Sequence, residues 1–512
     1  MHLRWDRIGT RSYFASFDEW PDGLEYVCGA RAIVDSGEFY LQLGPHRLQP
    51  RYAPGWSVIL AVPLALGVDP RGLVRVPALF DAAHALLLAS VAFALAWRWA
   101  PPGPGCSASR RRASAALAGL VAGLGWCLTP VCVDRARRVL SDPASAFFCS
   151  LVLVLCLMSL LPRRGKLVDR PWPMLLAGLA AGLATAIRTA NAALLLLPVA
   201  AIFIVLGLRR GWRAAGRAVA PAATGFFVVA GAVCWLVGRS GRSPLAWSGY
   251  ELWVPDLYSA LNVTFNWDYL LAGHPDFQMR MRETAATMGN LKANLGMLLG
   301  APFAPGHGLG DYWPLLGWLS ALGLAVWFWR RPPRDPRWGR IILLVGLAAW
   351  PLGHLVLYSL YFFVSYRFLI PVVAVAWVGL ALGVALYLQR DRVAWRSVPL
   401  ALAVLVFAFG GTIQGMQRVA TPPAGRQHRQ FVETERRFPQ WLRLTDEQRR
   451  GREQGFNPLV AHALGWLGPD VVRGIGEWGL YDIEVEHVER MVRNGRMAPE
   501  ETSKRDARRG AL

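Results

Sequence analysis

Charged residues are scarce in this sequence of 512 residues. They make up 17% of the chain, whereas soluble domains carry about a quarter, and hydrophobic residues make up 54%. Several uninterrupted apolar blocks approach the ~20 residues that a helix needs to cross the hydrocarbon core of a bilayer. The composition therefore excludes an ordinary soluble protein and indicates a polytopic membrane protein.

Metal-binding and nucleotide-binding motifs are absent as well. The seven cysteines form no CxxC pair and no cluster with histidine, so we expect neither a zinc site nor a disulfide framework. No phosphate-binding loop, dinucleotide-binding glycine motif, zinc-protease motif or nucleophile elbow occurs in a supporting context. Nothing in the sequence indicates nucleotide hydrolysis or hydride transfer.

The net charge of +21 would suggest a nucleic-acid partner in a soluble chain. Here, however, the basic residues gather in short connectors between apolar blocks, as the positive-inside rule predicts for cytoplasmic loops. We therefore predict the lipid bilayer as a partner, and no nucleic acid. The connectors are 110–112, 163–166, 209–210, 330–331 and 390–396.

The apolar runs predict an all-α polytopic membrane protein with about ten or eleven transmembrane helices, whose external loops carry short interfacial helices. The piece 56–68 is apolar but too short to span, so we expect a re-entrant or interfacial helix there. The predicted spans are 74–98, 114–133, 143–161, 172–187, 190–208, 217–238, 312–330, 340–363, 368–388 and 398–416.

Charge sidedness predicts the topology. If 1–73 lies outside, the loops that fall inside all carry clustered Arg or Lys, and only 135–138 is a partial exception. We expect a multi-pass protein of the plasma (inner) membrane with its functional site on the extracytoplasmic face. The predicted parts are a first external loop 1–73, transmembrane helices 74–238, a long external loop 239–311, transmembrane helices 312–416, and a C-terminal external tail or small helical domain 417–512.

This topology sends a tail of about 70 residues across the membrane without a preceding span, and no signal peptide is visible. Two explanations are open. A first helix is missing from this chain, or the tail itself is inserted.

Polar residues near the predicted membrane boundary are the candidates for chemistry. Asp22 shares a helical face with Tyr26 and is either an N-cap or a site carboxylate. Arg51 and Tyr52 precede the short apolar piece and suit an anionic phosphate. His46 is a loop residue that suits a phosphate or a metal.

Further charged candidates border or enter the predicted spans. Asp142 begins a span, as a cap, a site carboxylate or both. Arg188 and Arg367 lie close to hydrocarbon, where charged residues are expensive and either functional or snorkelling. Asp81 and His84 share one face of a span and form either a proton relay or hydrogen bonds within the bundle, and His354 is a lone intramembrane histidine.

The motifs resemble those of the GT-C glycosyltransferases, in the branch of protein O-mannosyltransferases and lipid A aminoarabinose transferases. The pattern of Asp22, Tyr26, Ala30, Gly37 and the run 51–56 resembles the first external loop of that family. Four later segments follow in the family's order: 140–143, 182–191, 243–250 and 366–371. The resemblance covers roughly residues 20–390. One departure is that Gly23 follows Asp22, where the family often has Glu. An adjacent Asp-Glu pair lies four residues earlier, at Asp18 and Glu19, so Asp18 is the alternative to Asp22 as the loop's functional carboxylate.

The resemblance implies an inverting hexosyl- or pentosyltransferase of the GT-C fold with a polyprenyl-phosphate-linked sugar as donor and a lipid, glycan or protein as acceptor. It implies Asp22 as the general base. Arg51, Arg188 or Arg367 would then supply positive charge to the leaving phosphate, with Tyr52 and His46 as further substrate-binding candidates. Asp142 would orient the acceptor or help to hold a divalent metal ion.

Two other functions are consistent with the composition. A transporter or flippase of a lipid-linked or polar solute would use charges at the membrane midplane, such as Asp81, His84 and His354. A non-catalytic scaffold would instead bind a partner through 417–512. The location of the essential charges separates the enzyme from the transporter.

Overall fold

The structure of this chain, a computed structural model, describes only part of the sequence. Arg51, Arg367, the predicted spans 312–330 and 398–416 and the tail 417–512 lie outside that part, and only isolated residues of 340–363 fall within it. The described residues are 22–43, 46–48, 50, 52–69, 72–73, 75–99, 107–136, 139–160, 162–163, 166–167, 171–241, 243–245, 247, 350, 353–354, 356–357 and 370–389.

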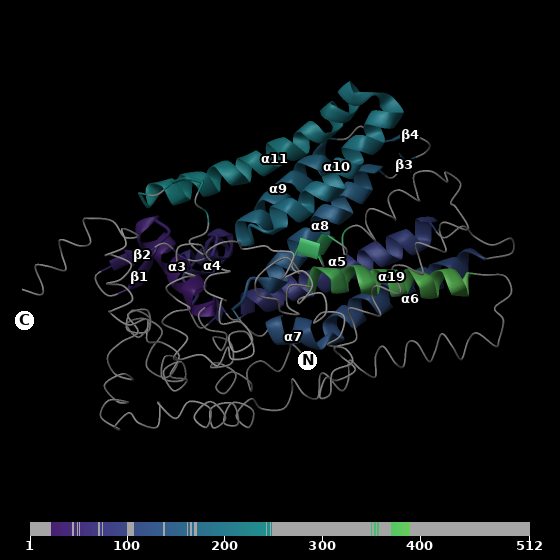
Figure 1. Ribbon diagram of the computed structural model, residues 1–512. Helices are drawn as coiled ribbons and strands as arrows, with labels where there is room; N and C mark the ends of the chain where they lie inside the picture. Colours follow the sequence, from purple (N-terminus) through teal and green to yellow (C-terminus); the bar gives the residue numbers. More distant parts are fainter. Residues whose placement is uncertain are drawn as a thin grey trace, which may run out of the picture.

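The described part is mainly helical, as the apolar runs predicted (Figure 1). Two short antiparallel hairpins add to the predicted all-α fold: Leu41–Leu43 (β1) pairs with His46–Leu48 (β2), and Pro162–Arg163 (β3) pairs with Lys166–Leu167 (β4). The helices are Asp22–Ser36 (α3), Gly55–Ala65 (α4), Arg75–Trp99 (α5), Ala108–Leu128 (α6), Pro130–Ala136 (α7), Asp142–Leu160 (α8), Trp172–Ile187 (α9), Asn191–Arg210 (α10), Trp212–Arg239 (α11) and Ile370–Leu388 (α19).

Three helices within the described residues are long and apolar enough to cross a membrane: Arg75–Trp97, Asn191–Leu208 and Trp212–Arg239. Shorter apolar helices occupy Asp142–Cys156, Trp172–Ile187 and Ile370–Ala385, where spans were also predicted. The short apolar piece predicted at 56–68 is α4, which has 11 residues.

Two apolar cores hold the helices together. In one, buried side chains of α5 and α6 pack against α19, which runs beside them in Figure 1. In the other, α8, α9, α10 and α11 pack together. Helices α3 and α4 lie next to the ends of α9 and α11 in the same view. The chain connections therefore bring several helix ends to one end of the bundle.

The span predicted at 114–133 is wrong at its end, because α6 stops at Leu128 and α7 starts separately at Pro130. A residue before proline is pushed out of the helical region, and Thr129 is extended (φ −69°, ψ 118°). The Thr129 hydroxyl donates to the Gly125 carbonyl over 2.8 Å and accepts the indole N–H of Trp377 over 2.8 Å. Average hydropathy stays high across this break, so the apolar run alone predicted one continuous helix.

Glycines allow α9 and α11 to approach closely. A side-chain carbon at Gly178 would overlap the Ala222 carbonyl, and one at Gly182 would lie 2.6 Å from Val229 Cβ. Small residues four apart let membrane helices pack backbone to backbone.

We expect Gly178→Ala to destabilise the protein by about 1–3 kcal/mol, because the added carbon must push the two helices apart. Gly231→Ala on α11 is the matched control, since an added carbon there meets no atom within 4 Å. Thermal unfolding in detergent measures both. Equal shifts in the two variants would contradict close packing at Gly178.

Candidate functional site

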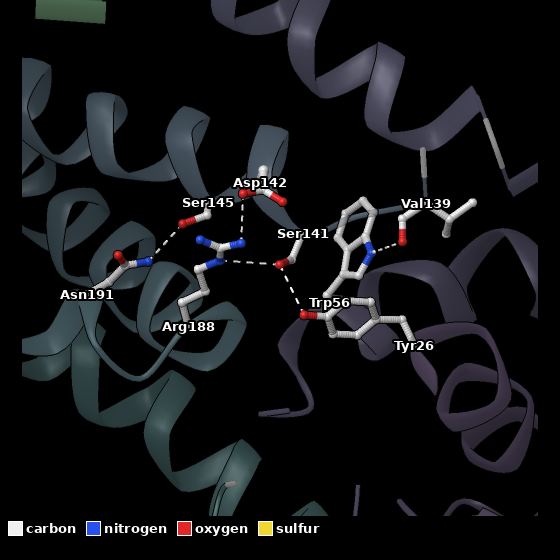
Figure 2. Close-up of polar contacts among 8 residues, drawn as sticks. All are labelled: Tyr26, Trp56, Val139, Ser141, Asp142, Ser145, Arg188 and Asn191. Carbon is white, nitrogen blue, oxygen red and sulfur yellow. Dashed lines mark hydrogen bonds and ion pairs between the residues drawn. The ribbon is translucent and has the colours of Figure 1, made fainter. Parts of the chain in front are cut away.

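The polar site lies where α8 begins, α9 ends and α10 begins, with α3 and α4 alongside (Figure 2). Helix ends leave backbone groups without partners inside the helix. Polar side chains at this level satisfy those groups and one another. The side chains that the structure brings together here are Tyr26, Trp56, Ser141, Asp142, Ser145, Arg188 and Asn191.

The turn between α9 and α10 aims Arg188 at α8. Arg188 is extended (φ −144°, ψ 112°), and its N–H donates to the Ala184 carbonyl over 2.9 Å. The Asn191 amide donates to that same carbonyl over 2.8 Å and to the Ser145 hydroxyl over 2.9 Å. Asn191 thereby locks the turn and ties it to the first turn of α8.

The central contact is an ion pair between Arg188 and Asp142. Arg188 Nη2 lies 2.7 Å from Asp142 Oδ1, and the two side chains are 18% and 1% exposed. Asp142 Oδ2 is buried and has no hydrogen-bond partner among the described residues. The Arg188 guanidinium thus points to a carboxylate of the neighbouring helix.

Asp142 does not cap α8 in the predicted way. The first helical hydrogen bond runs from the Ser145 N–H to the Ser141 carbonyl over 2.9 Å, so Ser141 occupies the position before the helix. Asp142 is the first helical residue. Its negative charge still benefits from the positive end of the helix dipole, while Oδ1 serves Arg188.

Ser141 joins this pair to α3. Its Oγ accepts the Nε–H of Arg188 over 3.3 Å and lies 3.1 Å from the Tyr26 hydroxyl, to which it is hydrogen-bonded. Tyr26 is buried in α3, one helical turn after Asp22. The helix that begins at Asp22 is thus hydrogen-bonded to Ser141, the residue before Asp142.

Helix α4 packs against the segment that precedes α8 and against the end of α9. The Trp56 indole N–H donates to the Val139 carbonyl over 3.5 Å, and the side chain is fully buried. A side-chain carbon at Gly55 would overlap the backbone of Ala186. Only glycine lets α4 come this close to the end of α9.

The structure tests only some of the predicted site residues. Asp22 is the first residue of α3 and His46 lies in β2, but the side chains of both are outside the described part, as are Arg51 and Arg367. Tyr52 is described: its ring centroid lies 5.0 Å from that of Tyr26.

Sequence reasoning missed Glu25 and Ser141, and quoted Asn191 only within a motif. Glu25 is 3% exposed, and its Oε1 accepts the Tyr52 N–H over 3.3 Å. The available signal was helical spacing, since Glu25 lies three residues after Asp22 and next to Tyr26. The partner atoms of these residues are far away in sequence, so spacing alone did not assign them a role.

A cysteine nucleophile is not indicated beside the site. Burial, and then the Glu25 charge, raise the pKa of the Cys28 thiol well above its usual value. Because the thiolate is the reactive species, a buried thiol with a raised pKa is inert. Cys28 is a packing residue of α3.

The predicted divalent metal ion finds few ligands in the described part. No three His, Cys, Asp or Glu residues gather there in a way that would hold one. Asp142 Oδ2 is an oxygen of the kind that hard cations prefer, but the other oxygen of that carboxylate faces the Arg188 cation. The described residues thus do not form a metal site by themselves, and metal binding stays a prediction.

The intramembrane candidates bond within the bundle. Asp81 Oδ1 accepts the Trp126 indole N–H over 2.7 Å, and His84 Nε2 lies 2.8 Å from Ser150 Oγ. His354 Nδ1 lies 3.1 Å from the Trp350 carbonyl oxygen. These contacts are hydrogen bonds within the bundle, one of the two interpretations that the sequence left open.

Comparisons with known proteins give similar structures but no similar sequence family. No protein-family model and no curated protein matches the sequence. The chain is similar to solved structures of ArnT from Cupriavidus metallidurans, in the apo state (19% identity, 94% of this chain and 77% of that chain, TM-score 0.47) and bound to undecaprenyl phosphate (19%, 94% and 75%, TM-score 0.49).

A further similar structure is the archaeal oligosaccharyltransferase AglB from Archaeoglobus fulgidus, in complex with an inhibitory peptide and a dolichol-phosphate (12% identity, TM-score 0.46). The match covers 81% of this chain and 55% of AglB. All these TM-scores are below 0.5.

We expect Arg188→Met to destabilise the protein by about 3–5 kcal/mol, because it leaves the buried Asp142 charge without its partner. Adding Asp142→Asn should restore most of that loss. Thermal unfolding of the single and double variants in detergent measures the coupling.

The control is Arg31→Met, which breaks the exposed Arg31–Asp35 pair of α3. Its expected cost is below about 1 kcal/mol. If the double variant were as unstable as the sum of the two single variants, Arg188 and Asp142 would not be coupled.

Proposed function

We propose that this chain is an inverting glycosyltransferase that moves a sugar from a polyprenyl-phosphate donor to an acceptor on the extracytoplasmic face of the membrane. The observation that carries the proposal is the hydrogen-bonded path from Tyr26 through Ser141 to Arg188 and Asp142. It joins the helix that begins at Asp22 to a carboxylate–guanidinium pair at the ends of apolar helices. The GT-C motifs of the sequence coincide with these residues.

The location suits this substrate. A polyprenyl chain dissolves among the apolar helices, and its phosphate then lies at the level where those helices end. Acceptor hydroxyls approach from the aqueous side. Helix ends that gather polar side chains at the membrane boundary provide both environments within one site.

The proposed reaction needs a base and a place for the leaving charge. Asp22 takes the proton of the acceptor hydroxyl while the acceptor oxygen attacks the anomeric carbon. The bond from that carbon to the phosphate oxygen breaks with oxocarbenium character in the sugar. The lipid phosphate leaves with the bonding electrons and is stabilised by the positive charge of Arg51 or Arg367.

Arg188 and Asp142 take another role in the proposal, because each neutralises the other. Asp142 Oδ2, buried and without a partner among the described residues, accepts a hydroxyl of the acceptor. Arg188 holds that carboxylate in place through its 2.7 Å contact with Oδ1. This fixed orientation raises the rate of transfer, because an acceptor that is already positioned loses less entropy on reaching the transition state.

The orientation in the membrane follows from charge. The hairpin of β3 and β4, with Arg163 and Lys166, connects the far ends of α8 and α9 from the site. Under the positive-inside rule this basic connector is cytoplasmic. The site is then extracytoplasmic.

We expect Asp22→Asn to lower the rate of sugar transfer by about 10²–10⁴-fold, the range that general bases contribute. The assay follows labelled sugar from a panel of polyprenyl-phosphate donors, with the protein in liposomes. Asp35→Asn is the control, because Asp35 is an exposed carboxylate at the other end of the same helix.

The control should transfer sugar at the rate of the unchanged protein. A folded Asp22→Asn variant that also keeps this rate would rule out Asp22 as the base. In that case Asp18 would be the next carboxylate to change.

A further inference from the structure

Glu25 is a buried carboxylate that the proposed reaction does not use. It is 3% exposed and lies on α3 three residues after Asp22, on the same side of the helix. Burying a carboxylate is costly unless hydrogen bonds compensate for the lost water. A retained buried Glu beside a site therefore calls for an explanation.

One partner of Glu25 is a backbone group of the segment that follows β2. Glu25 Oε1 accepts the Tyr52 N–H over 3.3 Å. The next residue of α3, Tyr26, places its ring 5.0 Å from the Tyr52 ring, at an interplanar angle of 35°. Two consecutive residues of α3 thus contact Tyr52, one at its backbone and one at its side chain.

The segment from Tyr52 to Gly55 is fixed at its other end too. Gly55 lies against the backbone of Ala186, two residues before Arg188. Ala53 is 4% exposed, and the Pro54 carbonyl accepts the Val58 N–H that opens α4. This segment therefore connects the helix of Asp22 to the turn of Arg188.

A carboxylate is better suited than an amide to such a buried acceptor. Glu brings only acceptor atoms, whereas Gln at this position brings two N–H donors that need partners of their own. A hydrogen bond to an ionised acceptor is also the stronger one. The contact needs the full length of the side chain, which Asp lacks by one methylene group.

We propose that Glu25 is a positioning residue, which holds the segment 52–55 against α3 so that the donor phosphate meets it in one fixed place. This inference rests on the proposed function, in which Arg51, the residue directly before this segment, is one of the two arginines that stabilise the phosphate of the lipid-linked donor. Glu25 acts through Tyr52 and touches no substrate itself.

The test uses two variants that separate reach from charge. Glu25→Asp keeps the charge but shortens the side chain, and Glu25→Gln keeps the length and an acceptor oxygen but removes the charge. We expect Glu25→Asp to raise KM for the polyprenyl-phosphate-sugar donor about tenfold with little change in kcat. Glu25→Gln should raise KM by a smaller factor, because Gln keeps an acceptor oxygen at the full length of the side chain although its two N–H donors fit the buried position less well.

A second readout does not depend on activity. Hydrogen exchange of the peptide that contains Tyr52 should speed up about tenfold in Glu25→Asp, because its amide loses the acceptor, and remain slow in Glu25→Gln. Asp35→Ala, at the exposed end of α3, is the control and should leave this exchange unchanged.

Three outcomes would overturn the proposal: both variants match the unchanged protein, the order of the two variants is reversed, or either lowers kcat with an unchanged KM. A reversed order would assign the effect to the charge rather than to the contact. If the unchanged protein transfers sugar from no polyprenyl-phosphate donor, the proposed function fails. The exchange data, with binding of undecaprenyl phosphate as the probe, then decide on Glu25 separately.

Discussion

The buried ion pair of Arg188 and Asp142 is the interaction on which the rest of the site depends. Neither charge is tolerable alone at this depth, since each loses its water when the helices pack. Together they require that α9 end and α8 begin at the same level. The neighbouring polar groups follow from that requirement: Asn191 fixes the turn behind Arg188, and Ser141 accepts its second N–H donor.

Gly55 and Trp56 help to fix the helix ends that carry this ion pair. Gly55 lets α4 touch the end of α9, and the buried Trp56 beside it donates to the Val139 carbonyl, three residues before α8 begins at Asp142. The pair therefore sits between two rigid contacts rather than on a free loop. A site held on packed helix ends keeps its geometry better than one on a flexible connection.

Much of the helical part could be predicted from the sequence, because apolar runs decide where membrane helices form. The start of α8 at Asp142, beside the predicted span 143–161, agrees with that expectation, whereas the start of α3 at Asp22 was expected from helical spacing instead. The break at Thr129 could not be read from hydropathy, although Pro130 was a visible signal. The contact of Glu25 with Tyr52 could not be predicted, because it joins a side chain to a backbone N–H 27 residues away. Long-range contacts to backbone atoms leave no pattern in sequence spacing.

The separation between the site and the buried pair of Asp81 and His84 also has a physical basis. Aromatic rings lie between them: Phe80 contacts Trp56 at 6.0 Å and Phe147 at 5.7 Å between ring centroids, and Phe147 lies 6.3 Å from His84. The two phenylalanine rings bring no hydrogen-bonding group into this row of contacts between Trp56 and His84. The described polar groups inside the bundle instead join helices: the Trp126 indole on α6 donates to Asp81 on α5, and His84 on α5 is hydrogen-bonded to Ser150 on α8.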